Sequence, residues 1–139
     1  MVIMAIDYGD VRTGVAVCDK MEMLASPVCV IEQRNADVLI DKICSLSNDY
    51  KAELIVVGLP KNMDSSEGER AEKCKAFATS LSLKSGIETV LRDERLSTVV
   101  AHNVLNTTNT RGKKRKAVVD QVAAVMILQD YIDFRKNNR

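Results

Sequence analysis

The stretch that decides the fold is residues 2–18, VIMAIDYGDVRTGVAVC. Residues 2–6 form an unbroken apolar run that is too short for a typical helix and is followed by turn residues, so we predict a strand buried on both faces. Two glycines, Gly9 and Gly14, are expected to supply positive φ angles in a turn, after which the chain returns as a second apolar strand. The stretch therefore predicts a β-hairpin with an acidic residue, Asp7, at its mouth.

Asp7 needs an explanation, because an ionised carboxylate at the end of a buried strand is costly to desolvate unless a positive or hydrogen-bonding group meets it. One interpretation is structural: the side chain accepts backbone N–H bonds from Gly9 or Asp10 in an Asx-turn. The other is a metal ligand or catalytic acid at a strand terminus, which requires acidic partners elsewhere in the chain. The hairpin sequence alone leaves both interpretations open.

Composition is that of an ordinary globular protein. The 139 residues are 46% hydrophobic and 28% charged, which fits one compact domain spanning residues 1–139. The net charge of +1 lacks the basic excess of many nucleic-acid binders, so any such contact must be local. No apolar run approaches the roughly 20 residues of a membrane span, and no signal peptide is evident, which predicts a soluble cytoplasmic protein. The four cysteines form no CxxC pair and are expected to be buried free thiols.

Hydrophobic periodicity predicts an α/β fold for the rest of the chain. A third short strand at 26–31 would complete an antiparallel meander with the first two. The further expected elements are a helix from Asn35 to Asn48, a strand at 54–57, a helix that begins at a capping box of Ser66 and Glu69 and ends at Gly86, a strand at 87–91, a short helix near 97–105, a loop at 106–116 and a last helix at 117–134. This order predicts a mixed five-stranded sheet, with three antiparallel and then parallel strands, and helices packed on its faces.

Three acidic residues are predicted to meet at one edge of this sheet. Asp7 and Glu94 each follow a strand whose carboxyl end lies at that edge, where open α/β sheets usually bind their ligands. Asp120 lies early in the last helix, and its helical neighbours are alanines and an isoleucine, so its carboxylate is expected to point inward. An ion pair with Lys116 or an interaction with the helix N-terminus would account for Asp120 without any site.

Three converging carboxylates would repel one another and raise one another's pKa values unless a divalent cation neutralised them. Oxygen ligands without His or Cys suit Mg²⁺ or Mn²⁺. Two such ions roughly 3.5 to 4 Å apart can activate a water and stabilise the leaving oxygen of a phosphodiester. In the expected arrangement Asp7 bridges the ions or binds one of them, Glu94 binds the ion that holds the attacking water, and Asp120 completes the shell of the other.

Four ordered motifs resemble the YqgF family, also called RuvX-like, over nearly the whole chain. The motifs are Asp7-Tyr8-Gly9 with Arg12-Thr13-Gly14, Val56-Val57-Gly58-Leu59-Pro60 with Asn62-Met63-Asp64, Asp93-Glu94-Arg95-Leu96-Ser97-Thr98, and Val119-Asp120 with Ala123-Ala124 and Leu128-Gln129. The resemblance implies an RNase H-like fold and a nuclease role in maturing the 5′ end of precursor 16S ribosomal RNA, with Holliday-junction cleavage as a second activity of relatives. It also places the family's acidic residues on Asp7, Glu94 and Asp120.

The chain departs from the family's usual residues at three positions. Thr13 replaces an apolar residue, Cys18 stands where a small hydroxyl residue is usual, and Ser65 stands where glycine is common. None of these changes removes an acid, so they bear on the shape of the substrate groove alone.

Basic residues near the acids are candidates for holding nucleic acid. Arg12 and Arg95 each neighbour a predicted catalytic carboxylate and could contact a phosphate or form a structural ion pair. Tyr8 could stack on one base. A basic run precedes the last helix. It could be an ordinary solvated loop, but we favour a role in binding phosphates for its cations, which are Arg111, Lys113, Lys114, Arg115 and Lys116. The expected partners are precursor rRNA or branched DNA, with ribosomal particles as a further partner, and the expected state is a monomer or a weak dimer.

Two other functions stay open on sequence alone. Sugar kinases and actin-like ATPases use a similar acidic first hairpin, but they close two such domains around a nucleotide and this chain has room for one. A non-catalytic ribosome-assembly factor would keep the fold without the activity, although the retained acidic trio argues against it.

Overall fold

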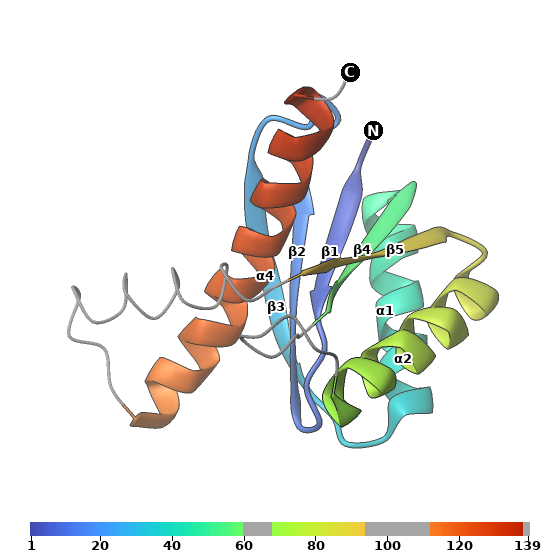
Figure 1. The fold of residues 1–139 in the computed structure, drawn as a ribbon, viewed down its shortest axis with the longest axis vertical. Coiled ribbons are helices and arrows are strands. Elements are labelled where there is room, and N and C mark those ends of the chain that lie inside the picture. The colour runs from blue at the N-terminus through green and yellow to red at the C-terminus, as the bar shows by residue number, and fades with distance from the viewer. Residues whose placement is uncertain (60–67, 94–111, 138–139) are drawn as a thin grey trace.

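A computed structural model describes residues 1–59, 68–93 and 112–137, and for residues 93 and 112–121 it describes the backbone alone. The described elements form one sheet with helices on both faces (Figure 1). The strands are β1 (Ile3–Asp7), β2 (Arg12–Cys18), β3 (Ala25–Glu32), β4 (Leu54–Leu59) and β5 (Glu88–Asp93). The helices are α1 (Ala36–Tyr50), α2 (Glu69–Ser85) and α4 (Gly112–Asn137). The short helix predicted near 97–105 lies outside the described residues.

The five strands are arranged in the order β3-β2-β1-β4-β5. β1 pairs antiparallel with β2 and parallel with β4, and β4 pairs parallel with β5. The mixed sheet predicted from the sequence is therefore confirmed, with the first strand at its centre. A central strand is flanked by hydrogen-bonded neighbours on both sides, which holds the end of β1 in a fixed place.

Helices cover the two faces of the sheet, which explains the unbroken apolar run of β1 (Figure 1). Met4 and Ile6 lie in a buried cluster with residues of α1 and α2. Ile3 and Ala5 point to the other face, where α4 packs over them. Successive side chains of a strand alternate between faces, so in a strand covered on both sides every side chain is buried and apolar residues are favoured at each position.

The helix ends agree with the sequence in part. The Asn35 side chain caps α1 by accepting the N–H groups of Asp37 and Val38, as predicted. Gly86 ends α2 in the left-handed conformation, with φ 71°. The predicted capping box is wrong, because Gly68 is the N-cap of α2 and Glu69 is its first residue; Ser66 lies outside the described residues.

The start of α4 was predicted too late in the chain. The helix begins at Gly112, so the basic positions 113–116 lie in its first turns and not in a loop. The charges of this run favoured a solvated loop, but Lys and Arg are also good helix formers. No helix among the described residues has the length and apolar character needed to span a membrane.

The turn between β1 and β2 differs from the prediction. Within the described ranges, positive φ at a glycine occurs at Gly86, so the positive φ expected at Gly9 and Gly14 is wrong. Gly14 lies inside β2, opposite Asp7. Gly9 is needed for space, because a Cβ atom there would lie 2.0 Å from the carbonyl oxygen of Arg12. The buried Thr13 hydroxyl accepts the Gly9 N–H at 3.3 Å and donates to the Gly9 carbonyl at 3.4 Å, which fixes the turn.

All four cysteines are free, as predicted, but only Cys18 and Cys74 are buried, whereas Cys29 and Cys44 are partly exposed. The Sγ atom of Cys18 accepts the Ile3 N–H at 3.2 Å and donates to the Met1 carbonyl at 3.6 Å. A small hydroxyl residue at this position could make the same two contacts, so the departure from the family's usual residue preserves a hydrogen-bonding role. Burial raises the pKa of the Cys18 thiol, which keeps it protonated near neutral pH.

A buried carboxylate ties α4 to the opposite end of the sheet from Asp7. Glu22, in the loop between β2 and β3, accepts hydrogen bonds from Arg135 Nε at 2.7 Å and from the Met1 ammonium at 3.1 Å. Burial by itself would raise the pKa of Glu22, but the hydrogen bonds and charges of these two partners outweigh it and lower the pKa to about 2.

This network predicts acid sensitivity. Because folding lowers the pKa of Glu22 below 4.5, its contribution to stability is complete above that pH and is lost as the pH falls towards 2. The contribution amounts to at most about 3 kcal/mol. Urea titrations of the wild type and of Glu22→Gln at a series of pH values measure it. The wild type is expected to be the more stable at neutral pH, with the two curves converging at low pH; parallel curves would contradict the assignment.

Candidate active site

Asp7 is the last residue of β1 and is partly exposed at the carboxyl end of the central strand. It shares the α4 face of the sheet with Ile3 and Ala5, because side chains alternate along the strand. The Gly9 amide, one of the two donors that an Asx-turn at Asp7 would use, is engaged by the Thr13 hydroxyl. Asp7 thus lies where the central strand ends and the turn to β2 begins.

The end of β5 lies at the same edge of the sheet. β1, β4 and β5 are parallel, and their pairing brings Asp93 beside Leu59 and Ile6 beside Val57. Backbones two strands apart are separated by about 10 Å. Acidic side chains at the ends of β1 and β5 can bridge this distance if each extends towards the other. Glu94 is the next residue after β5 in the sequence, and its own placement is outside the described ranges.

The length of α4 bears on the position of Asp120 relative to this edge. Arg135 contacts Glu22, which also holds the amino group of Met1, so the end of α4 lies by the start of β1. Fifteen helical residues before Arg135 correspond to about 22 Å. The six steps from Met1 to Asp7 correspond to about 20 Å of strand. Because α4 runs antiparallel to β1 (Figure 1), these lengths place backbone positions 120 and 7 at similar levels along the strand direction, while the first turns of α4 lean away from the sheet.

No group of three His, Cys, Asp or Glu side chains able to hold a metal is found among the side chains that the structure describes. That set includes Asp7 and excludes the side chains of Glu94 and Asp120. The convergence of the three acids therefore stays a prediction, supported by the strand order and by the direction of α4.

An arginine that the sequence did not single out holds the turn beside Asp7. Arg70, near the start of α2, donates to the Tyr8 carbonyl and to Asp10 Oδ1, the latter at 2.9 Å. Its guanidinium also lies 5.2 Å from the centre of the Tyr8 ring. These contacts join residues about sixty positions apart, so no local pattern could reveal them. Arg70 is a positioning residue for the hairpin that carries Asp7.

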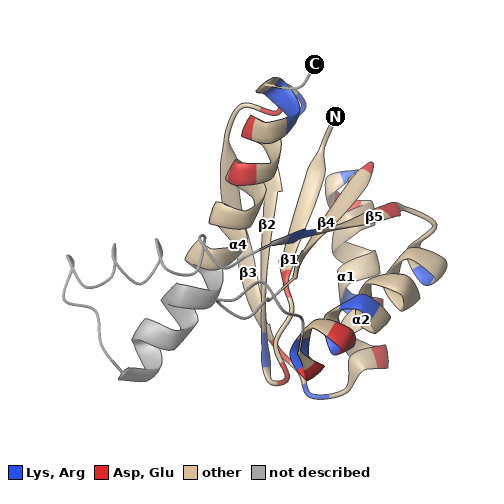
Figure 2. Cartoon of the chain, in the orientation of Figure 1, with Lys and Arg blue, Asp and Glu red and all other residues tan. Residues whose placement is uncertain are grey.

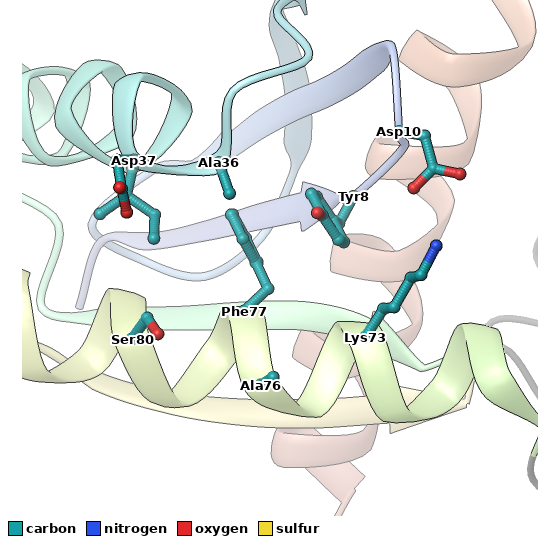
Figure 3. A pocket seen from close by; sticks show the side chains of 9 residues that line it. Tyr8, Asp10, Ala36, Asp37, Lys73, Ala76, Phe77 and Ser80 are labelled. Carbon is teal, nitrogen blue, oxygen red and sulfur yellow. The ribbon is translucent and has the colours of Figure 1, made fainter.

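A pocket of about 360 Å³ opens between this turn and helices α1 and α2 (Figure 3). Inside it the Tyr8 and Phe77 rings are stacked, with centroids 4.1 Å apart. Lys73 and Asp10 point towards each other at one end of the pocket, and Asp37 lies at the other (Figure 3). Because Phe77 and the Arg70 guanidinium both lie against the Tyr8 ring, the expectation that Tyr8 stacks on a base is not supported.

The predicted nucleic-acid contacts are described only in part. Arg12 lies on β2 opposite Glu32 of β3, and its Nη1 atom lies 3.7 Å from Glu32 Oε1. This pair supports the interpretation of Arg12 as part of a structural ion pair. Arg95 and Arg111 lie outside the described residues. The backbone positions of Lys113, Lys114, Arg115 and Lys116 are in the first turns of α4.

Comparisons with known proteins agree with the fold and the motifs. The sequence matches the family described as "RuvX: Holliday junction resolvase" over residues 1–134. A protein of Halothermothrix orenii named "Putative pre-16S rRNA nuclease" is 44% identical over 135 residues, which cover 97% of this chain and 96% of the relative. A protein of the same name from Agathobacter rectalis is 39% identical over 142 residues, covering 100% and 99%.

Among solved structures, RuvC of Thermus thermophilus in complex with a Holliday junction substrate aligns with a TM-score of 0.63. The alignment covers 99% of this chain and 96% of RuvC at 12% sequence identity, a likeness that concerns the fold. This agreement confirms the predicted RNase H-like architecture. The full-length sequence matches confirm the predicted family, and the chain is a member of the RuvX, or YqgF, family.

Proposed function

We propose that this protein is an endonuclease that hydrolyses phosphodiester bonds, with precursor 16S rRNA as its substrate and Asp7, Glu94 and Asp120 as its acidic centre. The observation that carries the proposal is the position of Asp7. It lies at the carboxyl end of the central strand, at the edge where β5 also ends. Relatives of about 40% identity that carry a pre-16S rRNA nuclease name support the choice of substrate.

The donor set suits a hard divalent cation. Carboxylate oxygens favour Mg²⁺ or Mn²⁺ as ligands. Asp7, Glu94 and Asp120 would hold two such ions, which when bound supply Lewis-acid stabilisation to the attacking and leaving oxygens of the phosphodiester. The chain's own contribution is to hold Asp7 still, through the strand pairs of β1, the Thr13 hydroxyl and the Arg70 contacts.

Substrate binding is assigned to the basic residues around this edge. Arg12, which is partly buried on the strand beside β1, can offer a planar donor pair to one phosphate. Arg95 and the run Arg111, Lys113, Lys114, Arg115 and Lys116 supply further cations close in sequence to Glu94 and Asp120. Since the net charge of the chain is only +1, the attraction for nucleic acid is local to this region.

Salt dependence tests this assignment. Lys113→Ala/Lys114→Ala is expected to weaken RNA binding and to make the slope of log K against log salt shallower by about 0.7 to 0.9 for each phosphate that the variant no longer neutralises. Filter binding of a labelled RNA over a range of salt concentrations measures the slope. The control is Lys42→Ala/Lys136→Ala, which removes two exposed cations elsewhere. Equal slopes for the two double variants would contradict a role for the basic run.

The function itself is tested by offering two substrates to purified protein. A labelled precursor-rRNA fragment and a four-way DNA junction are incubated with Mg²⁺ or Mn²⁺, and the products are mapped. We expect cleavage of the RNA near the mature 5′ end and no cleavage of either substrate in EDTA. Cutting that persists in EDTA would refute the metal-dependent mechanism.

Cleavage of the junction in preference to the RNA would favour the second candidate, a Holliday junction resolvase. The family description and the fold shared with Thermus thermophilus RuvC favour that candidate. An acidic-site variant that behaves like the wild type in rRNA maturation in cells would instead favour a non-catalytic assembly factor.

A further inference from the structure

Strand β5 ends the sheet, and among the described strands it pairs with β4 alone. An edge strand offers the N–H and C=O groups of its outer side to another strand. Proteins often prevent such pairing with proline or a β-bulge. β5 reads ETVLRD and follows β4 in continuous register from Glu88 to Asp93, with neither device; its charged residues, which discourage pairing with a strand of the wrong charge, are Glu88, Arg92 and Asp93. Its outer side is therefore suited to accept a further strand.

The two faces of β5 differ. Val90 packs with residues of α4, and Arg92 Nε donates to Asp130 of α4 at 2.8 Å, so Glu88, Val90 and Arg92 share the α4 face. Thr89 lies on the α2 face. There it lines a groove of about 460 Å³ that also includes the two exposed leucines of this region, Leu83 of α2 and Leu91 of β5.

Two of the three charged residues of β5, Glu88 and Arg92, are placed symmetrically about Val90. Figure 2 shows acidic and basic positions towards opposite ends of the strand. If two copies of β5 pair antiparallel with Val90 opposite Val90, Glu88 of each copy faces Arg92 of the other, and Leu91 faces Thr89. Opposite charges directly across an antiparallel pair are stabilising and like charges are destabilising. Parallel pairing in the same register would place equal charges side by side.

Both charged residues are able to make this contact. Within the described part of the chain Glu88 has no ion-pair partner. Arg92 contacts Asp130 through Nε and its guanidinium lies over the Phe134 ring, 4.5 Å from the ring centre, while a guanidinium has five N–H donors at its edge. A second carboxylate can therefore join Arg92 without displacing the first.

We propose that two copies of this chain pair through β5 to form a symmetric dimer in which the sheet continues from one copy into the other. A twofold axis makes the contact self-complementary. Surface ion pairs contribute little individually, so the dimer is expected to be weak and reversible. A strand from another protein is the alternative occupant of this edge. It would leave the isolated chain monomeric, and it gives no reason for the charge symmetry.

Sedimentation equilibrium of the full chain over a wide concentration range tests the proposal. The wild type is expected to show a reversible monomer–dimer equilibrium. In the proposed dimer, position 88 of each copy faces position 92 of the other. Glu88→Arg and Arg92→Glu therefore each create two pairs of like charges, and each is expected to weaken the dimer about tenfold or more. The double variant Glu88→Arg/Arg92→Glu restores the match and is expected to dimerise again. An equimolar mixture of the two single variants should form a heterodimer, because their charges are complementary.

Two controls separate pairing from folding. Asp49→Arg makes the same change of charge as Glu88→Arg on exposed α1 and should dimerise like the wild type. Asp130→Asn removes the charge of the intramolecular partner of Arg92 and should leave dimerisation intact. A wild type that stays monomeric throughout would overturn the proposal. So would a Glu88→Arg variant that dimerises normally, or a mixture that forms no heterodimer.

Discussion

Asp7→Asn is expected to slow phosphodiester cleavage by about a thousandfold or more, on the order of 4 kcal/mol of transition-state stabilisation. Asparagine keeps the shape of the side chain at the end of β1 but removes the charge that would hold a divalent cation. The same change relieves repulsion among the three predicted carboxylates, so the melting temperature should stay the same or rise. Single-turnover cleavage and thermal unfolding, measured on the same preparation, test both statements.

Metal binding gives a second measurement for this variant. Mg²⁺ is expected to raise the melting temperature of the wild type, since a ligand that binds the folded state stabilises it, and to have less effect on Asp7→Asn. Asp49→Asn, an exposed aspartate on α1, is the matched control and should behave like the wild type. An Asp7→Asn variant that cleaves within tenfold of the wild type would contradict the assignment of Asp7.

Gly9→Ala is expected to destabilise the protein by about 2 to 4 kcal/mol and to lower the melting temperature by about 10 °C. The added Cβ would lie 2.0 Å from the Arg12 carbonyl oxygen, so the turn must open or shift. Such a shift breaks the Thr13 contacts with Gly9 and displaces Asp7, so cleavage should fall as well.

Gly86→Ala is the informative comparison for this prediction. Gly86 has φ +71°, but nothing lies within 4 Å of a Cβ atom there. Its replacement should cost only the left-handed backbone penalty of about 1 kcal/mol. Thermal and urea unfolding of the two variants measure the difference. Equal losses of stability would show that the close approach at Gly9 is not what requires glycine.

Much of the fold could be predicted because local patterns and long-range structure agree. The apolar run of β1 is buried on both faces as its composition indicates, and Asn35 and Gly86 mark helix ends by local chemistry. The predicted capping box was wrong because a Ser and a Glu three residues apart can occur near a helix start without forming one; the N-cap of α2 is Gly68. The start of α4 was misplaced because charge patterns do not distinguish a solvated loop from a solvated helix turn.

The contacts that position the candidate site could not be predicted in the same way. Arg70 meets Tyr8 and Asp10 from about sixty residues away, and Glu22 meets Arg135 across 113 residues. Such pairs depend on how the elements pack, which no local periodicity encodes. The shared edge of β1 and β5 was accessible to sequence reasoning, because the carboxyl ends of parallel strands lie together; the meeting of the three acids there stays a prediction.

The covering of one sheet face by α4 has a consequence for synthesis. Strands β1, β2 and β4 leave the ribosome well before α4 does, so the face that carries Ile3 and Ala5 stays exposed to water until the helix has been made. An exposed apolar surface of this kind promotes aggregation of partly folded chains. The proposed acidic centre also waits for Asp120. A nascent nuclease built in this order would be unable to cut the ribosomal RNA beside which it emerges.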